Sequence, residues 1–157
     1  MNLIVFDCDN TLWELPYEED DIFMKTSESI TDYEFKYKQN VIDIYKEKCK
    51  DENNKFVILT NRRTSIQNII LEKLYNDKGL KFDYILFMNK DRDKSKRLNT
   101  IITDDVEYVE YYDDKDKHIN CIKTLMPKYL DIKFKTFKVW KQLNWSWLEN
   151  VKKNCKP

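Results

Sequence analysis

Two carboxylates with a spacing of two residues follow the first apolar run of this 157-residue chain, in Asp7-Cys8-Asp9-Asn10-Thr11. Residues two apart in an extended chain point the same way, so Asp7 and Asp9 can converge while Cys8 turns away. Paired carboxylates repel each other unless a cation offsets their charge, and Mg²⁺ prefers such oxygen ligands. A capped turn without chemistry is the alternative, because Asp, Asn and Thr are common turn residues. The apolar run directly before the pair favours the metal site.

A second polar triplet, Thr60-Asn61-Arg62, follows another apolar run. The hydroxyl and the backbone N–H groups could hold a phosphoryl oxygen, and Arg62 could pair with it in a bidentate manner. Thr60-Asn61 is equally compatible with an ordinary helix N-cap.

A third polar group, Asp113-Asp114, follows a later apolar run and again suits a hard cation. The alternative is an acidic loop in which Asp114 caps the next helix. Between the second and third groups, the basic segment 90–97 could supply a lysine to the same site, although most of its charges fit a solvated helix start.

The elements that position these groups are predicted from apolar patterning. Continuous apolar runs at 2–6, 56–59, 84–87 and 106–112 are typical of buried parallel strands, and the alternating run 132–139 predicts an edge strand. Helical spacing is expected over 31–50, 64–77, 95–103, 115–126 and 143–152, with Thr31 or Asp32 as an N-cap and Gly79 as a C-cap.

Strands that alternate with helices predict an α/β fold: a three-layer, Rossmann-like parallel sheet with helices on both faces. Ligands in such folds bind beyond the carboxyl ends of the strands, which is where the three polar groups fall. The length predicts one domain over 1–157, with a small flap or cap insertion at 12–54.

Composition excludes several functions. The 28 basic and 28 acidic residues give no net charge, so nucleic-acid binding would need a local basic patch. The single glycine excludes glycine-rich phosphate loops, and no apolar run reaches the roughly 18–20 residues of a membrane span. The four cysteines lack paired spacing, which indicates neither zinc nor disulfides and fits a reducing cytoplasmic or nuclear location.

The order of these groups resembles the haloacid dehalogenase-like (HAD) superfamily over roughly residues 1–126. Its hhhDxDxT motif is matched at 3–11, its apolar run ending in Thr or Ser at 56–60, and its acidic pair at 113–114, with a lysine preceding that pair. The run 112–118 is similar to the YEDRxxH pattern of phosphatase-like domains associated with RNA repair. The triplet 60–62 resembles the TGR of those domains and of polynucleotide kinase 3′-phosphatases. Positions 61, 113 and 115 depart from these narrower patterns.

The resemblance implies an Mg²⁺-dependent phosphatase. It makes Asp7 the nucleophile that forms an aspartyl-phosphate, and Asp9 the general acid and base. The implied metal ligands are Asp7, the backbone carbonyl of Asp9, and Asp114, with Asp113 nearby. The remaining phosphoryl oxygens would be bound by Thr60 and a lysine. Lys96 is preferred because it begins the helix before the fourth strand, and Lys94 and Lys90 are alternatives.

The small insertion predicts an open site that admits a bulky substrate such as a polynucleotide end or a phosphoprotein. Thr11, Asn61 and Arg62 are the expected substrate contacts. Trp13 and Tyr17 could stack on a base or pack within the flap. The polynucleotide-end phosphatase is preferred over a capless protein or small-molecule phosphatase and over a catalytically silent binding module.

One further residue is left open by the sequence. His118, the single histidine, either lies on the helix surface or contacts substrate.

Overall fold

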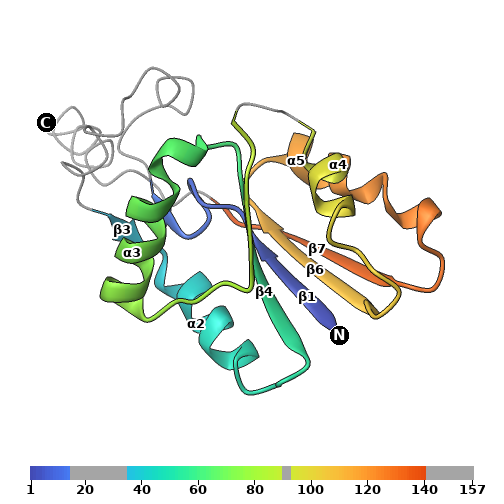
Figure 1. Cartoon of the computed structure of the whole chain (residues 1–157), viewed down its shortest axis with the longest axis horizontal. Coiled ribbons are helices and arrows are strands. Elements are labelled where there is room, and N and C mark those ends of the chain that lie inside the picture. Colours follow the sequence, from blue (N-terminus) through green and yellow to red (C-terminus); the bar gives the residue numbers. More distant parts are fainter. Residues whose placement is uncertain (15–34, 90–92, 141–157) are drawn as a thin grey trace, which may run out of the picture.

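The computed structural model describes residues 1–14, 35–89 and 93–140. Its centre is a five-stranded parallel sheet of order β5-β4-β1-β6-β7 (Figure 1). The strands are β1 (Asn2–Phe6), β4 (Asn54–Thr60), β5 (Tyr84–Phe87), β6 (Tyr108–Asp113) and β7 (Lys133–Lys138). A small antiparallel ribbon joins β2 (Trp13–Glu14) to β3 (Lys36–Tyr37). The predicted parallel α/β sheet is confirmed, and β7 lies at its edge as expected.

Helices cover both faces of this sheet. They are α2 (Gln39–Lys48), α3 (Gln67–Lys78), α4 (Lys94–Asn99) and α5 (Asp116–Lys123), with 3₁₀ turns η2 (Thr64–Ile66) and η3 (Met126–Lys128). Side chains of α2 and α3 share one core with the sheet, and side chains of α4 and α5 share the other. The fold therefore has three layers, with α4 and α5 opposite α2 and α3 (Figure 1).

Strand β1 shows why the apolar runs predicted the sheet. Ile4 and Phe6 enter the α2–α3 core, whereas Leu3 and Val5 enter the α4–α5 core. Because successive side chains in a strand alternate between faces, a central strand covered on both sides must be apolar at every position.

Some helix boundaries differ from the prediction. Helix α2 begins at Gln39 rather than at residue 31, because Lys36 and Tyr37 pair with β2 in the ribbon. The C-cap Gly79 is confirmed, with φ 70°. The predicted helix 143–152, the N-cap candidates Thr31 and Asp32, and Tyr17 lie outside the described residues. None of the described helices is both long and apolar enough to cross a membrane.

Parallel register brings the polar groups to one edge of the sheet. Phe6 is paired with Ile58 of β4 and with Tyr112 of β6. The residues that follow, Asp7 after β1 and Asp113 at the end of β6, therefore lie side by side.

Candidate active site

A tight turn follows β1 and fixes Asp7. The Asp7 N–H continues the sheet ladder by donating to the Tyr112 carbonyl at 3.0 Å. The chain then turns back: the N–H groups of Thr11 and Leu12 both donate to the Cys8 carbonyl, at 3.1 and 2.9 Å. Asn10 adopts φ 61°, a left-handed conformation that Asn tolerates better than most residues. The motif therefore forms a tight turn, and this turn also positions Asp7 at the candidate site, so the two interpretations considered for it are compatible.

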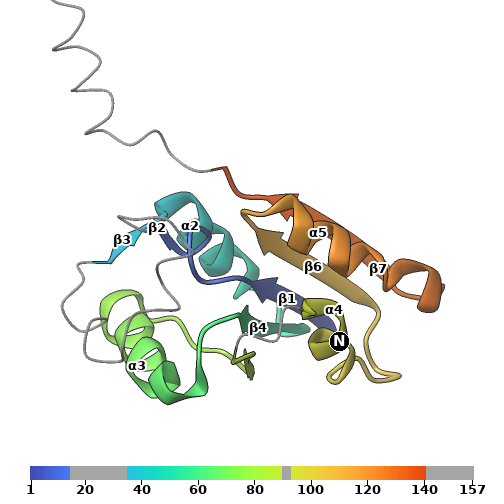
Figure 2. The same ribbon diagram turned by 90° about the horizontal axis from the view of Figure 1, so that it is seen from above.

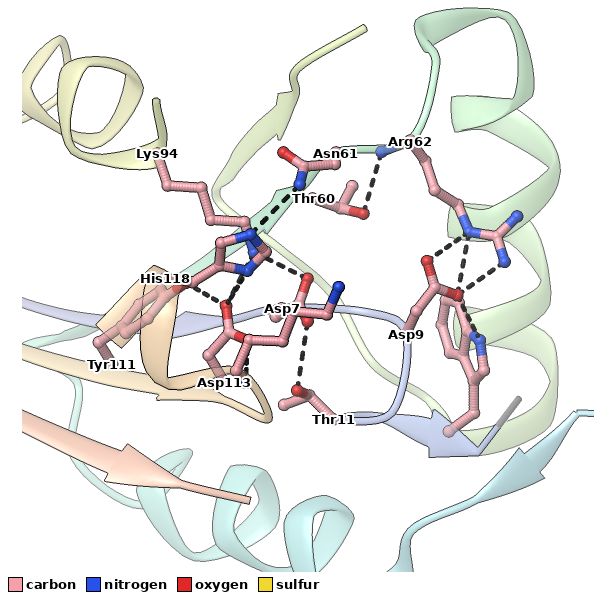
Figure 3. A network of polar contacts seen from close by, with 12 residues as sticks. Asp7, Asp9, Thr11, Thr60, Asn61, Arg62, Lys94, Tyr111, Asp113 and His118 are labelled. Carbon is pink, nitrogen blue, oxygen red and sulfur yellow. Dashed lines mark hydrogen bonds and ion pairs between the residues drawn. The ribbon is translucent and has the colours of Figure 1, made fainter. Parts of the chain in front are cut away.

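The same turn separates Asp7 from Asp9. Because the chain does not remain extended after Asp7, the two side chains diverge, and the expectation that they converge is wrong (Figure 3). Thr11 lies on the Asp7 side of the turn, and its hydroxyl donates to Asp7 Oδ2 at 3.4 Å. Thr11 thus supports the Asp7 carboxylate directly.

Three acids from neighbouring strands converge instead. Asp7, Asp113 and Asp114 each offer a carboxylate oxygen, and these oxygens lie within 4.8 Å of one another. Such a cluster of hard oxygen donors fits Mg²⁺. The predicted pairing of acids from two strand ends is present, without the Asp9 side chain. A role for the Asp9 backbone carbonyl stays a prediction.

Asp113 is the most heavily bonded of these acids. Its Oδ2 accepts from Lys94 Nζ at 2.8 Å and from the Tyr111 hydroxyl, and lies 3.2 Å from His118 Nδ1. Its Oδ1 accepts from the Lys115 N–H at 3.0 Å. A carboxylate has about four lone-pair sites. Three partners share Oδ2 and one binds Oδ1, so most of this capacity is used within the protein, and a direct role of Asp113 in metal binding stays a prediction.

Lys94, rather than Lys96, reaches the carboxylates. Its side chain is fully buried, and Nζ lies 2.9 Å from Asp7 Oδ1 and 2.8 Å from Asp113 Oδ2. Lys96 is exposed, because residues two apart on a helix point about 200° apart. Its backbone N–H is taken by the Asp93 cap at 3.1 Å. Lys94 was one of the two alternatives, and Lys90 lies outside the described residues.

Arg62 pairs with Asp9 instead of pointing at a free phosphate site. Arg62 Nη2 lies 2.6 Å from Asp9 Oδ1, and Nε lies 2.8 Å from Asp9 Oδ2, in a buried ion pair. Trp13 Nε1 donates to the same carboxylate at 3.0 Å. Figure 3 shows this second group apart from the acids around Lys94. Arg62 thus contacts the candidate acid–base residue, and its expected contact to substrate stays a prediction.

Trp13 is a packing residue. Its side chain is 2% exposed and meets the Phe35 ring edge-on at 4.7 Å between centroids. Of the two roles considered for Trp13, packing within the flap is confirmed, and it adds a hydrogen bond to Asp9 that sequence reasoning missed.

Thr60 and Asn61 end β4 beside the acids. The Thr60 side chain is buried, and its hydroxyl accepts from the Arg62 N–H at 3.3 Å. Asn61 Nδ2 lies 3.5 Å from His118 Nε2. These contacts bring both residues to the same strand edge as Asp7.

His118 belongs to the site rather than to the helix surface. It is buried, with Nδ1 toward Asp113 and Nε2 toward Asn61. A neutral imidazole that carries its proton on Nδ1 can donate to Asp113 and accept from the Asn61 amide. The signal available in the sequence was spacing, because His118 lies one helical turn beyond the acidic pair.

Tyr111 was not anticipated as a site residue. It is fully buried, and its hydroxyl donates to Asp113. Alternation in a strand could have indicated it, since Tyr111 and Asp113 are two apart and therefore share a face.

Burial and mutual repulsion shape the charges. Burial, and next the negative charge of Asp113, raise the pKa of Asp7 well above its usual value. Burial would also raise the pKa of Asp113, but Lys94 and His118 outweigh it and lower that pKa. Burial alone would lower the pKa of Lys94, yet attraction to Asp7, Tyr111 and Asp113 raises it well above normal. A buried cation thus stabilises two crowded carboxylates.

Comparison with known proteins supports the fold. No protein-family model and no curated protein match the chain. The HAD domain of the effector protein Lem4 from Legionella pneumophila matches with a TM-score of 0.57 and 15% identity, over 99% of this chain and 95% of that one. The L. pneumophila effector Ceg4 matches with a TM-score of 0.53 and 12% identity, over 99% and 96%.

A chain of the Pnkp1/Rnl/Hen1 RNA repair complex matches with a TM-score of 0.61 and 15% identity, over 90% of this chain. The match covers 43% of the chain from the complex, so the present protein corresponds to less than half of that chain. With these structural neighbours, the parallel sheet and its layers define a HAD-like α/β fold.

Proposed function

We propose that this chain is an Mg²⁺-dependent phosphomonoesterase that acts through an aspartyl-phosphate on Asp7. The observation that carries the proposal is the convergence of Asp7, Asp113 and Asp114 from two neighbouring strands, with Lys94 buried between the first two. Three carboxylates within 4.8 Å repel one another, Lys94 offsets the charge of Asp7 and Asp113, and a bound cation would balance the charge that the third carboxylate adds.

The chemistry assigned to these residues has two steps. In the first, an Asp7 carboxylate oxygen attacks phosphorus, a bond from that oxygen to phosphorus forms, and the bond to the leaving oxygen breaks while Asp9 gives that oxygen a proton. In the second, water attacks phosphorus, Asp9 takes its proton, and phosphate leaves with Asp7 restored. Lys94 and Thr11 hold the Asp7 carboxylate in orientation for the first step, and the Lys94 charge offsets part of the rise in its pKa.

Asp7 and Asp114 would hold the cation. Bound there, Mg²⁺ supplies positive charge for the equatorial oxygens of the transferred group. Thr60, at the tip of β4, would donate its hydroxyl to one of these oxygens, and the adjacent Asn61 would contact the substrate as well.

Asp9 must change partners to act. Its carboxylate is bonded to Arg62 and Trp13, so proton transfer requires it to leave this pair and turn toward the leaving group. Arg62 is therefore a positioning residue that holds the Asp9 carboxylate after its proton has gone to the leaving oxygen; Asp9 then leaves this pair to take the proton of the attacking water.

A polynucleotide end is the preferred substrate. Among the described residues, the insertion between the first two motifs adds only the β2–β3 ribbon and α2, and α2 packs into the core instead of covering the site. Similarity to a chain of an RNA repair complex also favours this substrate. A protein phosphatase is the second candidate, because an open site would also admit a phosphoprotein.

The test compares phosphate release from a 3′-phosphorylated oligonucleotide, a phosphotyrosine peptide and p-nitrophenyl phosphate, each with Mg²⁺ or EDTA. The proposal expects turnover that requires Mg²⁺, is fastest on the oligonucleotide and is abolished in Asp7→Asn. Asp105→Asn, an exposed acid, is the control. Faster release from the peptide would favour a protein phosphatase over a polynucleotide-end phosphatase. Full activity of Asp7→Asn would refute Asp7 as the nucleophile. No turnover on any substrate would favour a silent binding module.

A further inference from the structure

A basic and aromatic run occupies the edge of the sheet next to the candidate active site. From Lys133 to Trp140 the sequence reads KFKTFKVW, and between Asp131 and Glu149 it has four lysines and no acid. In a chain with no net charge, this is a marked local excess of positive charge. Aromatic side chains interleaved with lysines are typical of surfaces that bind single-stranded nucleic acid.

Part of this run lies on a face of β7 that none of the described helices covers closely. Lys133, Lys135 and Phe137 alternate along β7 and so share one face, on which Phe137 stacks against Tyr112 at 5.0 Å between ring centroids. Helix α5 packs on the other face, and of the described helices it is the one that packs closely against β7 (Figure 2). Phe137 is 41% exposed.

The two exposed aromatic residues of this run have contacts within the protein. Phe137 continues a stack through Tyr112 to Phe6, whose centroid lies 5.1 Å from that of Tyr112. Trp140 is 73% exposed, and its carbonyl accepts from the buried Lys38 side chain at 2.6 Å. Lys138 Nζ lies 4.2 Å from the centroid of the Trp140 ring. Ordered, exposed rings lose little conformational entropy when a base stacks on them.

Two acids lie near this run. Asp116 of α5 pairs with Lys138 at 3.0 Å, so Lys138 is not counted among the free charges of this face. Glu110 projects from β6 toward the same side as Phe137, but it is buried, is hydrogen-bonded by Tyr108 and Tyr112, and pairs with Lys48. The charge presented by Lys133 and Lys135 therefore faces outward without an acid beside it on β7.

The carboxyl end of β7 borders the candidate active site, although the Asp113 side chain projects to the opposite face of the sheet, with Tyr111. Tyr112 is paired with Phe137 and Asp113 with Lys138, and the Val139 N–H donates to the Asp113 carbonyl at 2.8 Å. Asp7 lies two strands away, roughly 10 Å at about 4.8 Å per strand. That is about three base steps at the ~3.4 Å rise of stacked nucleotides.

We infer that Lys133, Lys135, Phe137 and Trp140, here called the β7 platform, bind the single-stranded polynucleotide whose phosphorylated end enters the active site. This inference rests on the proposed function for its substrate class. The lysines contact backbone phosphates, and Trp140 stacks on a base behind the reacting end. Lysines on a free edge strand also protect against aggregation, but exposed Phe137 and Trp140 oppose that purpose.

The test measures binding without turnover. A fluorescein-labelled single-stranded RNA with a 3′-hydroxyl is titrated with the protein in EDTA, and anisotropy gives Kd. Trp140→Ala is expected to weaken binding about tenfold, and Trp140→Phe to retain most of it. Neutralising Lys133 and Lys135 to Gln is expected to lower the slope of log K against log salt by about 1.4 between about 50 and 200 mM.

Matched controls lie elsewhere on the surface. Tyr75→Ala removes an exposed aromatic ring from α3, and a double change of Lys117 and Lys123 to Gln removes two exposed charges from α5. Both are expected to bind like the wild type. Equal binding by the platform variants and the controls, or no binding by the wild type, would overturn the inference. So would an acidic peptide that binds equally well and is insensitive to Trp140→Ala.

Because the assay needs neither Mg²⁺ nor a phosphate ester, it is independent of the proposed chemistry. Loss of binding in the platform variants would support the platform even if Asp7 proved inert. Catalysis without RNA binding would instead leave the phosphatase proposal standing and remove the platform.

Discussion

Replacing Lys94 by methionine tests how much its ion pairs with Asp7 and Asp113 contribute to stability. Methionine keeps most of the side-chain length and removes the charge that lies 2.9 Å from Asp7 and 2.8 Å from Asp113. Removing one partner of a buried ion pair costs about 3–5 kcal/mol, because the remaining charge stays buried without compensation. With Lys94 fully buried, little of this cost can be recovered from solvent. We expect Lys94→Met to lose about 3–5 kcal/mol of unfolding free energy at pH 7 in EDTA.

The pH dependence gives the sign of the effect. Burial and Asp113 already raise the folded-state pKa of Asp7 above its unfolded value, and loss of Lys94 raises it further. Between the unfolded and folded values, the folded protein binds more protons than the unfolded chain, so stability falls as pH rises through this window. The deficit of Lys94→Met relative to wild type should therefore shrink as pH is lowered from 7 toward the unfolded value of Asp7.

The assay is urea unfolding followed by circular dichroism at several pH values. Lys96→Met, an exposed change two residues away, should stay within about 0.5 kcal/mol of wild type. Adding Asp7→Asn to Lys94→Met should recover part of the loss, because it removes the uncompensated charge. A Lys94→Met protein no less stable than Lys96→Met would refute the reasoning.

Three other predictions follow from the same geometry. Mg²⁺ should raise the melting temperature of the wild type in a thermal-shift assay. The rise should be smaller at pH 5 than at pH 7.5, because the raised pKa of Asp7 lets protons compete with the cation. The Asp114→Asn variant should lose this rise, and an equal rise in that variant would exclude the metal site. Trp13→Phe keeps the ring packing but removes a buried hydrogen bond to the Asp9 carboxylate, and urea unfolding should show a loss of about 1.5–3 kcal/mol. Gly79→Ala forces a side chain into φ 70° and should cost about 1–2 kcal/mol by the same measurement, whereas Gly79→Asn should cost less.

The sheet was predictable because burial on both faces leaves a strong signal. All five strands of the sheet fall on the predicted apolar or alternating runs, and Gly79 ends α3 as expected. The start of α2 was not predictable from helical spacing alone. Residues 36–37 are drawn into a ribbon with β2, a pairing that depends on tertiary structure.

Within the site, the strand tips were predictable and the side-chain directions were not. Parallel strands must end at a common edge, so Asp7 and Asp113 had to be neighbours. The direction of Asp9 depends on a turn with Asn10 at positive φ, and the choice of Lys94 over Lys96 depends on where α4 begins relative to its Asp93 cap. A shift of one residue in where a turn or helix begins changes which side chain faces the site, and apolar patterning does not predict such a shift.

The central place of β1 has a consequence for biosynthesis. Strand β1 leaves the ribosome before its two partners, β4 and β6, and the β6 partner of Asn2, Tyr108, comes about a hundred positions later in the chain. The backbone amide of Asp7 is also fixed by Tyr112. Until that distant strand has been translated, β1 has one unpaired side. A nascent chain therefore passes through a long interval in which its most apolar segment is exposed, and native pairing depends on contacts of high sequence separation, which form slowly.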